Sequence, residues 1–154
     1  MNGSDQGHQA ELGKMRFGHD GDGGLGDRLV EAVLRGEKTA TSSLLRDYEE
    51  NEPLPRAGER LVLVDSSGRS RGVVETVEVR TVALRDIDLS IALAEGEGFE
   101  SVADWEQAHR AFWASTPSSG AERSSQESLS DTELVVVEFF HLVETGRGSA
   151  GNGP

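Results

Sequence analysis

A lysine among hydroxyl side chains marks the stretch of this sequence where reactive chemistry is most expected. Lys38 lies in RGEKTATSS, two residues after Gly36, and is accompanied by four hydroxyl residues, Thr39, Thr41, Ser42 and Ser43. A lysine that is partly removed from water has a lowered pKa and can accept a proton from a hydroxyl group or a water molecule. Thr41, once deprotonated, can attack an acyl carbon or a phosphorus atom. The structural alternative is that Lys38 stabilises the last carbonyl groups of the helix predicted before it.

Lys38 and Thr41 can react together only if their side chains point to the same side of the chain. Residues three apart in a regular strand point to opposite faces, so Lys38 and Thr41 converge only if the chain turns or bulges between them. Gly36 permits a bend nearby, because glycine adopts left-handed backbone angles without steric cost.

Glu75 is the carboxylate that we expect to meet this lysine. Alternation in VVETVEV places Val73, Glu75, Val77 and Val79 on one face of a strand, which we predict to face inward. A buried carboxylate without a partner costs several kcal/mol or becomes protonated. Lys38 is the partner we propose for it. A slipped register or a bulge would instead turn Glu75 towards solvent.

Two further ionisable residues lie in apolar surroundings. Glu138 shares its predicted strand face with Leu134, Val136, Phe140 and Leu142, and pairing with a nearby arginine is the role we can offer it. His109 lies between Trp105 and Phe112 on the apolar face of a predicted helix. It is either a core residue with one satisfied hydrogen bond or a residue with a direct role at a site.

No metal or cofactor motif is expected. The histidines at positions 8, 19, 109 and 141 lack ligand spacing and the chain has no cysteine, which argues against structural zinc. The AEGEG segment at 94–98 lacks the third glycine of a dinucleotide fingerprint, and no predicted strand precedes it. P-loop, GxSxG and HExxH patterns do not occur.

The predicted elements suggest an α+β domain. Apolar residues at helical spacing run from Leu25 to Leu34, and Gly36 suits the left-handed position past a helix end. A second helix is predicted from Ser101, where Ser101 and Asp104 have capping-box spacing. Strands are predicted at 39–45, 60–65, 72–84 and 133–143. This order favours a small mixed sheet or β-barrel with flanking helices.

Composition limits the classes of function. The chain has 154 residues, 35% of them hydrophobic, and a net charge of −13, which suits one acidic domain. Repulsion of a polyanion argues against a sequence-independent nucleic-acid coat protein, but a local site for one or a few nucleotides remains open. Without a long apolar run, a signal peptide or cysteine, we expect a soluble cytoplasmic protein with no membrane partner.

Low-complexity segments define the expected domain limits. Residues 1–14 and 145–154 are predicted to be disordered tails around a domain at 15–144, and the serine-rich segment 115–131 is predicted to be a long loop.

Four segments together resemble the ASCH domain family of the PUA-like superfamily. They are LRGEKTATSSL, GERLVLVDSSGRSRGVVETVEV, ALAEGEGFESVADWEQAHRAFW and VVVEFFHLV, which cover about residues 15–143. The resemblance implies a small PUA-like β-barrel with flanking helices and a cleft beside the glycine–lysine segment. Family members are proposed to bind RNA or modified nucleotides. Some relatives remove the acetyl group from N4-acetylcytidine, and some are described as ribonucleases.

The resemblance also implies site residues. In the amidohydrolase relatives, a lysine, a threonine three residues later and a strand glutamate form the reactive set, and Lys38, Thr41 and Glu75 stand at matching places. The wider family has an arginine five positions after the lysine, where this chain has Ser43. Arg46 is the nearest substitute.

Two main functions follow. The first is hydrolysis of an N-acylated nucleoside, with Thr41 as nucleophile or water ligand, Lys38 as base and Glu75 as proton relay. Backbone N–H groups near residues 39–43 would then stabilise the oxyanion. The alternatives are a ribonuclease, or a non-catalytic module that binds RNA or a nucleotide through phosphate contacts and base stacking. The expected ligand contacts are Gly36, Thr39, Ser42, Ser43, Arg46, Tyr48, Trp105 and His109. A third function compatible with the sequence is a protein-interaction adaptor that uses the acidic surface.

Overall fold

A computed structural model describes residues 12–18, 23–115 and 129–145 of the chain. Its strands are β1 (Gly13–Met15), β2 (Ala40–Leu44), β3 (Arg60–Val64), β4 (Ser70–Ala83) and β5 (Leu134–Thr145). Its α-helices are α2 (Leu25–Leu34), α3 (Leu89–Ala94) and α4 (Val102–Ser115), and short 3₁₀ turns occupy Leu45–Asp47 and Leu84–Asp86. The α+β prediction is confirmed.

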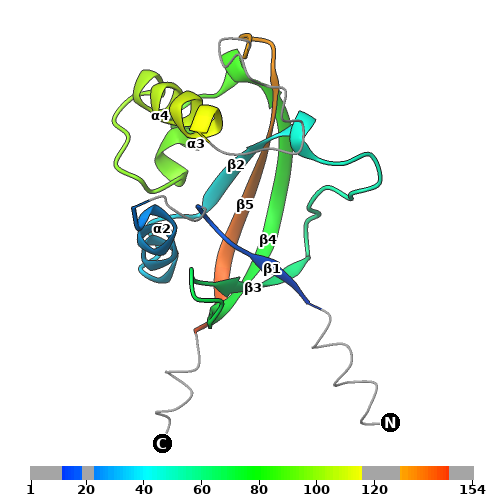
Figure 1. Cartoon of the computed structure of the whole chain (residues 1–154), viewed down its shortest axis with the longest axis vertical. Helices are drawn as coiled ribbons and strands as arrows, with labels where there is room; N and C mark the ends of the chain where they lie inside the picture. Colours follow the sequence, from blue (N-terminus) through cyan, green and yellow to red (C-terminus); the bar gives the residue numbers. More distant parts are fainter. Residues whose placement is uncertain (1–11, 19–22, 116–128, 146–154) are drawn as a thin grey trace, which may run out of the picture.

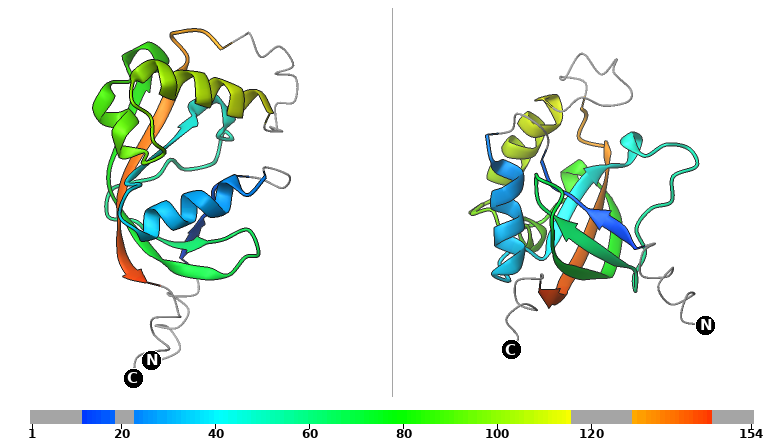
Figure 2. Two further views of the ribbon diagram at one scale, coloured as in Figure 1. Left: turned by 90° about the vertical axis from the view of Figure 1, so that its left-hand side faces the viewer. Right: turned by 60° about the horizontal axis from the view of Figure 1, so that its bottom comes forward.

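The five strands form one curved mixed sheet in the order β1-β3-β4-β5-β2. β1 pairs with β3 in parallel, and the other three pairs are antiparallel. The long strands β4 and β5 run through the centre, and α2, α3 and α4 lie together on one side of them (Figures 1 and 2). The sheet therefore curls as a half-barrel around the side that the helices cover.

The end of α2 positions the lysine segment. Gly36 adopts a positive φ of 81°, as predicted, and the Glu37 N–H donates to the Ala32 carbonyl oxygen at 2.9 Å. This arrangement satisfies a carbonyl group of the last helical turn and reverses the chain direction. The chain then enters β2 at Ala40, so Lys38 lies in the connection before the strand begins.

Two apolar clusters divide the core. The first joins α3 and α4 to β2 and β5 and includes Leu44, Ile91, Trp105, Trp113 and Val135. The second lies under α2, against β1, β3, β4 and β5, and includes Met15, Val30, Leu63, Val74 and Phe140.

The inward face of β4 is the reverse of the predicted one. Val74 and Thr76 are fully buried, whereas Val77 is 49% exposed and Glu75 is half-buried. Valines occur on both faces of this strand, so alternation alone did not identify the buried face. A register shift between Thr76 and Glu78 opposite β5 further breaks the regular alternation.

Domain limits also differ in detail. β1 begins at Gly13 and β5 ends at Thr145, so the strands extend slightly into both segments predicted as tails. Leu129, in the predicted serine-rich loop, is buried in the first core cluster. Residues 1–11, 116–128 and 146–154 lie outside the described part of the chain. β1 and α3 were not predicted.

Within the described residues, no helix has the length and apolarity needed to cross a membrane.

Candidate functional site

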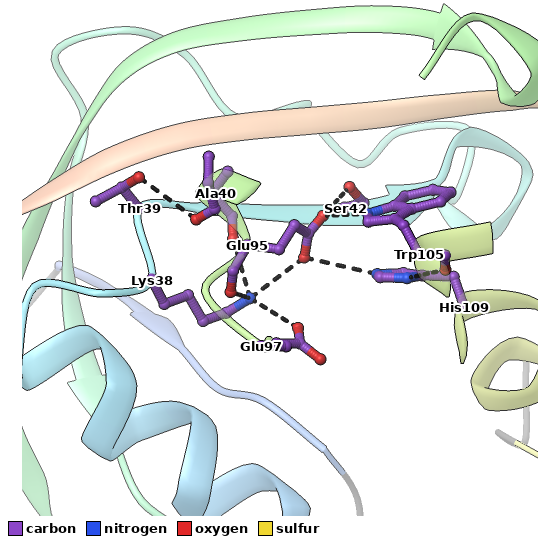
Figure 3. A network of polar contacts seen from close by, with 9 residues as sticks. Lys38, Thr39, Ala40, Ser42, Glu95, Glu97, Trp105 and His109 are labelled. Carbon is purple, nitrogen blue, oxygen red and sulfur yellow. Dashed lines mark hydrogen bonds and ion pairs between the residues drawn. The ribbon is translucent and has the colours of Figure 1, made fainter. Parts of the chain in front are cut away.

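Lys38 is a buried cation whose charge is met by oxygen atoms. Only 2% of its surface is exposed, and its Nζ lies 3.3 Å from Glu95 Oε1 and 3.2 Å from Glu97 Oε2. Nζ also donates to the carbonyl oxygens of Ala40 at 3.0 Å and Glu95 at 3.2 Å (Figure 3). The Phe17 ring centroid lies 5.2 Å from the same nitrogen. Four oxygens around one nitrogen suit an ammonium group, which has three protons to donate.

The alternative role for Lys38, as a cation at the C-terminus of a helix, is correct, but the helix is not the predicted one. Its ammonium group does contact a helix C-terminus, but that of α3, through the carbonyl of Glu95. The helix before it, α2, is closed by the backbone around Gly36 instead.

Glu95 is the centre of this polar cluster. Its side chain is 1% exposed and accepts hydrogen bonds from Ser42 Oγ and from Trp105 Nε1, the latter at 3.2 Å. Burial alone would raise the pKa of Glu95, but the charge of Lys38 and the contact with His109 overcome it and lower the pKa to about 2. Glu95 is therefore a carboxylate throughout the physiological pH range.

A glycine explains how α3 reaches Lys38. Gly96 directly follows Glu95 and has a φ of 67°. A Cβ atom at this position would overlap the carbonyl oxygen of Glu37 and the Cα atom of Lys38. Only glycine allows the two backbones to pass this closely, and this passage delivers the Glu95 carboxylate to the lysine.

α4 supplies the aromatic side of the cluster. His109 stacks on Trp105 with ring centroids 4.0 Å apart, and its Nδ1 donates to the Trp105 carbonyl oxygen at 2.9 Å. Its other ring nitrogen lies 3.6 Å from Glu95 Oε1. His109 is thus a core residue with a satisfied nitrogen, and it also lines the cavity described below.

The same residues raise the question of a metal ion. Glu95, Glu97 and His109 each place one ligand atom within 4.8 Å of the others. The ammonium group of Lys38 already pairs with both carboxylates, so a divalent cation would add its charge beside an existing one. Lys38 already supplies a positive charge to both carboxylates, and we assign the cluster as an internal ion-pair network.

A cavity of about 630 Å³ opens beside this network. Three groups of polar side chains line this cavity. The hydroxyl groups come from Thr41, Ser42, Ser43 and Tyr48; the carboxyl groups from Glu52, Glu95, Glu97 and Glu138; and the cations from Lys14, Arg16 and Lys38. Phe17 and Phe112 add aromatic surface, and Met15, Leu25, Leu29 and Leu61 add aliphatic surface. The volume and the mixture of apolar walls with a few polar groups are typical of a small-molecule site.

A second group of polar side chains in the cavity lining comes from the sheet. Thr41 of β2 and Glu138 of β5 are direct cross-strand partners, so their side chains project from the same face of the sheet. Thr76 Oγ1 donates to Glu138 Oε2 at 2.6 Å. The hydroxyl groups of Ser43 and Tyr48 lie 3.1 Å apart, and burial raises the pKa of Tyr48. The arginine partner suggested for Glu138 is wrong, since Thr76 takes that place.

The structure brings together two of the three predicted reactive residues. Lys38 and Thr41 both line the cavity, and the spacing objection does not apply because Lys38 precedes the strand. The predicted pairing of Lys38 with Glu75 is wrong. Glu75 pairs with Arg60 at 3.1 Å, at a site where the arginine side chain is 55% exposed, and it does not line the cavity.

Some of the predicted ligand contacts line the cavity and others do not. Ser42, Ser43, Tyr48 and His109 line the cavity. Gly36, Thr39, Arg46 and Trp105 do not line it. Gly36 is exposed at the end of α2, and Trp105 is completely buried. The Thr39 N–H donates to the Ala94 carbonyl oxygen, and Arg46 is held by two 2.7 Å hydrogen bonds to Glu133. With its N–H group engaged, Thr39 cannot supply the predicted oxyanion contact.

Glu95 and Glu97 are the residues that sequence reasoning missed. The glycines of AEGEG do not make a dinucleotide fingerprint, and the segment contains no P-loop, GxSxG or HExxH pattern. The useful signal was a glutamate placed directly after the apolar helix LSIALA and before a glycine, where Gly96 and Gly98 both have positive φ. Such a segment turns sharply at the helix end and directs its carboxylates at a neighbouring element.

Comparison with known proteins gives one consistent result. A family model for the ASCH domain matches residues 14–144. An ASCH domain structure from Lactobacillus crispatus is similar with a TM-score of 0.71 and 26% identity over 86% of this chain and 80% of that one. A protein structure from Enterococcus faecalis gives 0.70 and 28% over 94% and 90%. A hypothetical protein structure with a TM-score of 0.51 and 16% identity, covering 77% of this chain and 94% of that one, shares the fold. No curated protein sequence matches the chain.

Proposed function

The chain belongs to the ASCH domain family, and from this premise we propose that its cavity binds a modified nucleoside or a single nucleotide. The observation that carries the proposal is the lining of the cavity. An internal ion-pair network at Lys38, the hydroxyl groups of Thr41, Ser43 and Tyr48, and the ring of Phe17 surround a space of about 630 Å³. Hydroxyl and carboxylate groups suit the polar edge of a base, and aromatic rings suit its face.

Charge favours a small ligand over an RNA strand. Lys38 is neutralised by two carboxylates and Arg46 by Glu133, so neither is free to hold a phosphate backbone. Lys14 and Arg16 are exposed residues that line the cavity, enough for one phosphate group. A polyanion would also meet a chain with a net charge of −13.

Hydrolysis of an N-acyl group is the reaction that this site would support. In our proposal, a water molecule held by Thr41 adds to the acyl carbon and its proton passes to the Glu97 carboxylate. The same proton then moves to the leaving nitrogen as the C–N bond breaks, releasing a free amine and a carboxylic acid. Lys38 keeps its proton and holds the Glu97 carboxylate in place through their 3.2 Å ion pair. In this proposal Glu97 takes both the role of base that the sequence suggested for Lys38 and the role of proton relay that it suggested for Glu75.

N4-Acetylcytidine is the substrate with which to test this proposal. Binding is measured by calorimetry, and cleavage by release of acetate, with wild-type protein and a Thr41→Val variant. We expect wild type to bind and cleave, and Thr41→Val to lose cleavage at least about 100-fold, the lower range for removal of a proton-transfer or polar catalytic group. Thr81→Val, on an exposed position of β4 outside the cavity lining, is the matched control.

Two outcomes would count against the proposal. Equal cleavage by wild type and Thr41→Val would remove Thr41 from the reaction. Failure of N4-acetylcytidine, cytidine and cytidine monophosphate to bind would argue against a nucleoside site altogether.

A further inference from the structure

Glu138 is a buried carboxyl group in the cavity wall that the proposed reaction does not use. It is 9% exposed, and Thr76 donates to its Oε2 atom at 2.6 Å. Across residues 12–18, 23–115 and 129–145, no lysine, arginine or histidine forms an ion pair with it. Glu95, by contrast, faces both Lys38 and His109. The two carboxyl groups line one cavity in opposite electrostatic settings.

The neighbours of Glu138 disfavour its charge. Burial raises its pKa, the Thr76 hydrogen bond opposes this, and the negative charge of Glu59 raises the pKa further. Tyr48, near β2, feels the charge of Glu138 in turn. The remaining charged or titratable groups of the cavity are Lys14 from β1, Arg16 directly after it, Lys38 before β2, Glu52 and Glu97 from loops, Glu95 from the end of α3, and His109 from α4. None of these cations pairs with Glu138.

The Glu138 carboxyl group lies beside Thr41, the residue that we propose to hold the reacting water molecule. Thr41 and Glu138 are cross-strand partners in the β2–β5 ladder, and such partners have Cβ atoms about 4.5–5.5 Å apart. A ligand whose carbonyl group is within reach of the Thr41 hydroxyl is therefore also next to Glu138.

We propose that Glu138 takes up a proton when a ligand fills the cavity and, as a neutral carboxyl group, donates a hydrogen bond to a carbonyl oxygen of that ligand. A bound neutral ligand displaces water without supplying a countercharge, which further disfavours the carboxylate. A ligand with a carbonyl acceptor, such as an acyl group or the ring oxygen of a pyrimidine, then receives the new donor. The inference rests on the proposed nucleoside site and assigns Glu138 as the residue that selects carbonyl-bearing ligands.

The first experiment needs no ligand. Unfolding by urea is measured between pH 4.5 and pH 8 for wild type, Glu138→Gln and Glu75→Gln. A group with a raised pKa in the folded state stabilises at low pH and loses that contribution as pH rises through its folded pKa. We therefore expect wild type to lose stability relative to Glu138→Gln as the pH rises, with a several-fold change in the ratio of unfolding constants. Glu75→Gln, in an exposed ion pair, should not remove this pH dependence. Parallel profiles for wild type and Glu138→Gln would overturn the inference.

The second experiment measures proton uptake on binding. Cytidine, which has a ring carbonyl group and no acyl group to cleave, is titrated into each protein at pH 6 and pH 8, in buffers of different ionisation enthalpy. Wild type should take up part of a proton and bind more weakly at pH 8, by at most tenfold per pH unit. Glutamine imitates the neutral carboxyl group, so Glu138→Gln should bind with little pH dependence and without uptake. Wild-type binding without proton uptake would refute the role of Glu138 alone, whereas no binding at any pH would reject the nucleoside site as well.

Discussion

Replacement of Lys38 by methionine tests the electrostatic core of the site. Methionine approximates the length of the lysine side chain and removes its charge, which leaves the Glu95 carboxylate, 1% exposed, without its main partner. Removal of one member of a buried ion pair costs about 3–5 kcal/mol. The lowering of the Glu95 pKa from 4.5 to about 2 corresponds to roughly 3 kcal/mol at about 1.4 kcal/mol per unit. We therefore expect Lys38→Met to lower the free energy of unfolding by about 3 kcal/mol at pH 7.

The assay is urea unfolding followed by tryptophan fluorescence, since Trp105 and Trp113 are both buried. Arg60→Met is the matched control, because its pair with Glu75 is half-exposed and such pairs contribute about 0–1 kcal/mol. The double variant Lys38→Met/Glu95→Gln removes both charges and should be more stable than Lys38→Met alone. A Lys38→Met protein within about 1 kcal/mol of wild type, or a double variant less stable than the single one, would refute the reasoning.

Three further predictions follow from the same network. Because the folded pKa of Glu95 is depressed, its contribution to stability is present above pH 4.5 and is lost as the pH falls towards 2. Urea unfolding of wild type should show this loss, and Glu95→Gln should show a smaller one, since other carboxyl groups with a lowered pKa, such as Asp65, keep their contribution. Gly96→Ala should cost at least about 2 kcal/mol in unfolding free energy, because the new Cβ overlaps the Glu37 carbonyl, whereas Gly98→Ala, with open space around it, should cost about 1 kcal/mol. Trp105→Phe removes one hydrogen bond to the buried carboxylate and should cost about 1–3 kcal/mol in the same assay; a cost near zero would mean that this bond does not hold Glu95.

Much of the fold could be predicted because local signals agreed with it. The α2 segment carried both helical spacing and a terminal glycine, and Gly36 has the left-handed conformation that its position implied. The strands β3 and β5 contain apolar runs that are bounded by polar residues, whereas β2 is a short run of small hydroxyl residues between Ala40 and Leu44. β4 was harder, since valines at 73, 74, 77 and 79 populate both of its faces.

The site was only half predictable for a different reason. Lys38 and Thr41 are close in sequence, so their unusual context was visible without a structure. Glu95 lies 57 residues from Lys38 along the chain, and its arrival depends on a close backbone contact at Gly96 that no periodic pattern encodes. Glu75 was predicted as the partner of Lys38 because alternation placed it among valines on one face of a predicted strand.

Mapping of a nucleoside onto the folded chain tests the central claim most directly. Amide NMR spectra of ¹⁵N-labelled protein are recorded during titration with N4-acetylcytidine. A ligand in the cavity should shift the amide signals of Phe17, Thr41, Ser43, Tyr48 and Glu97, all from residues that line it, and leave exposed β4 positions such as Thr81 unchanged. Shifts confined to surface residues outside this set, or no shift at millimolar nucleoside, would contradict a nucleoside-binding cavity at Lys38.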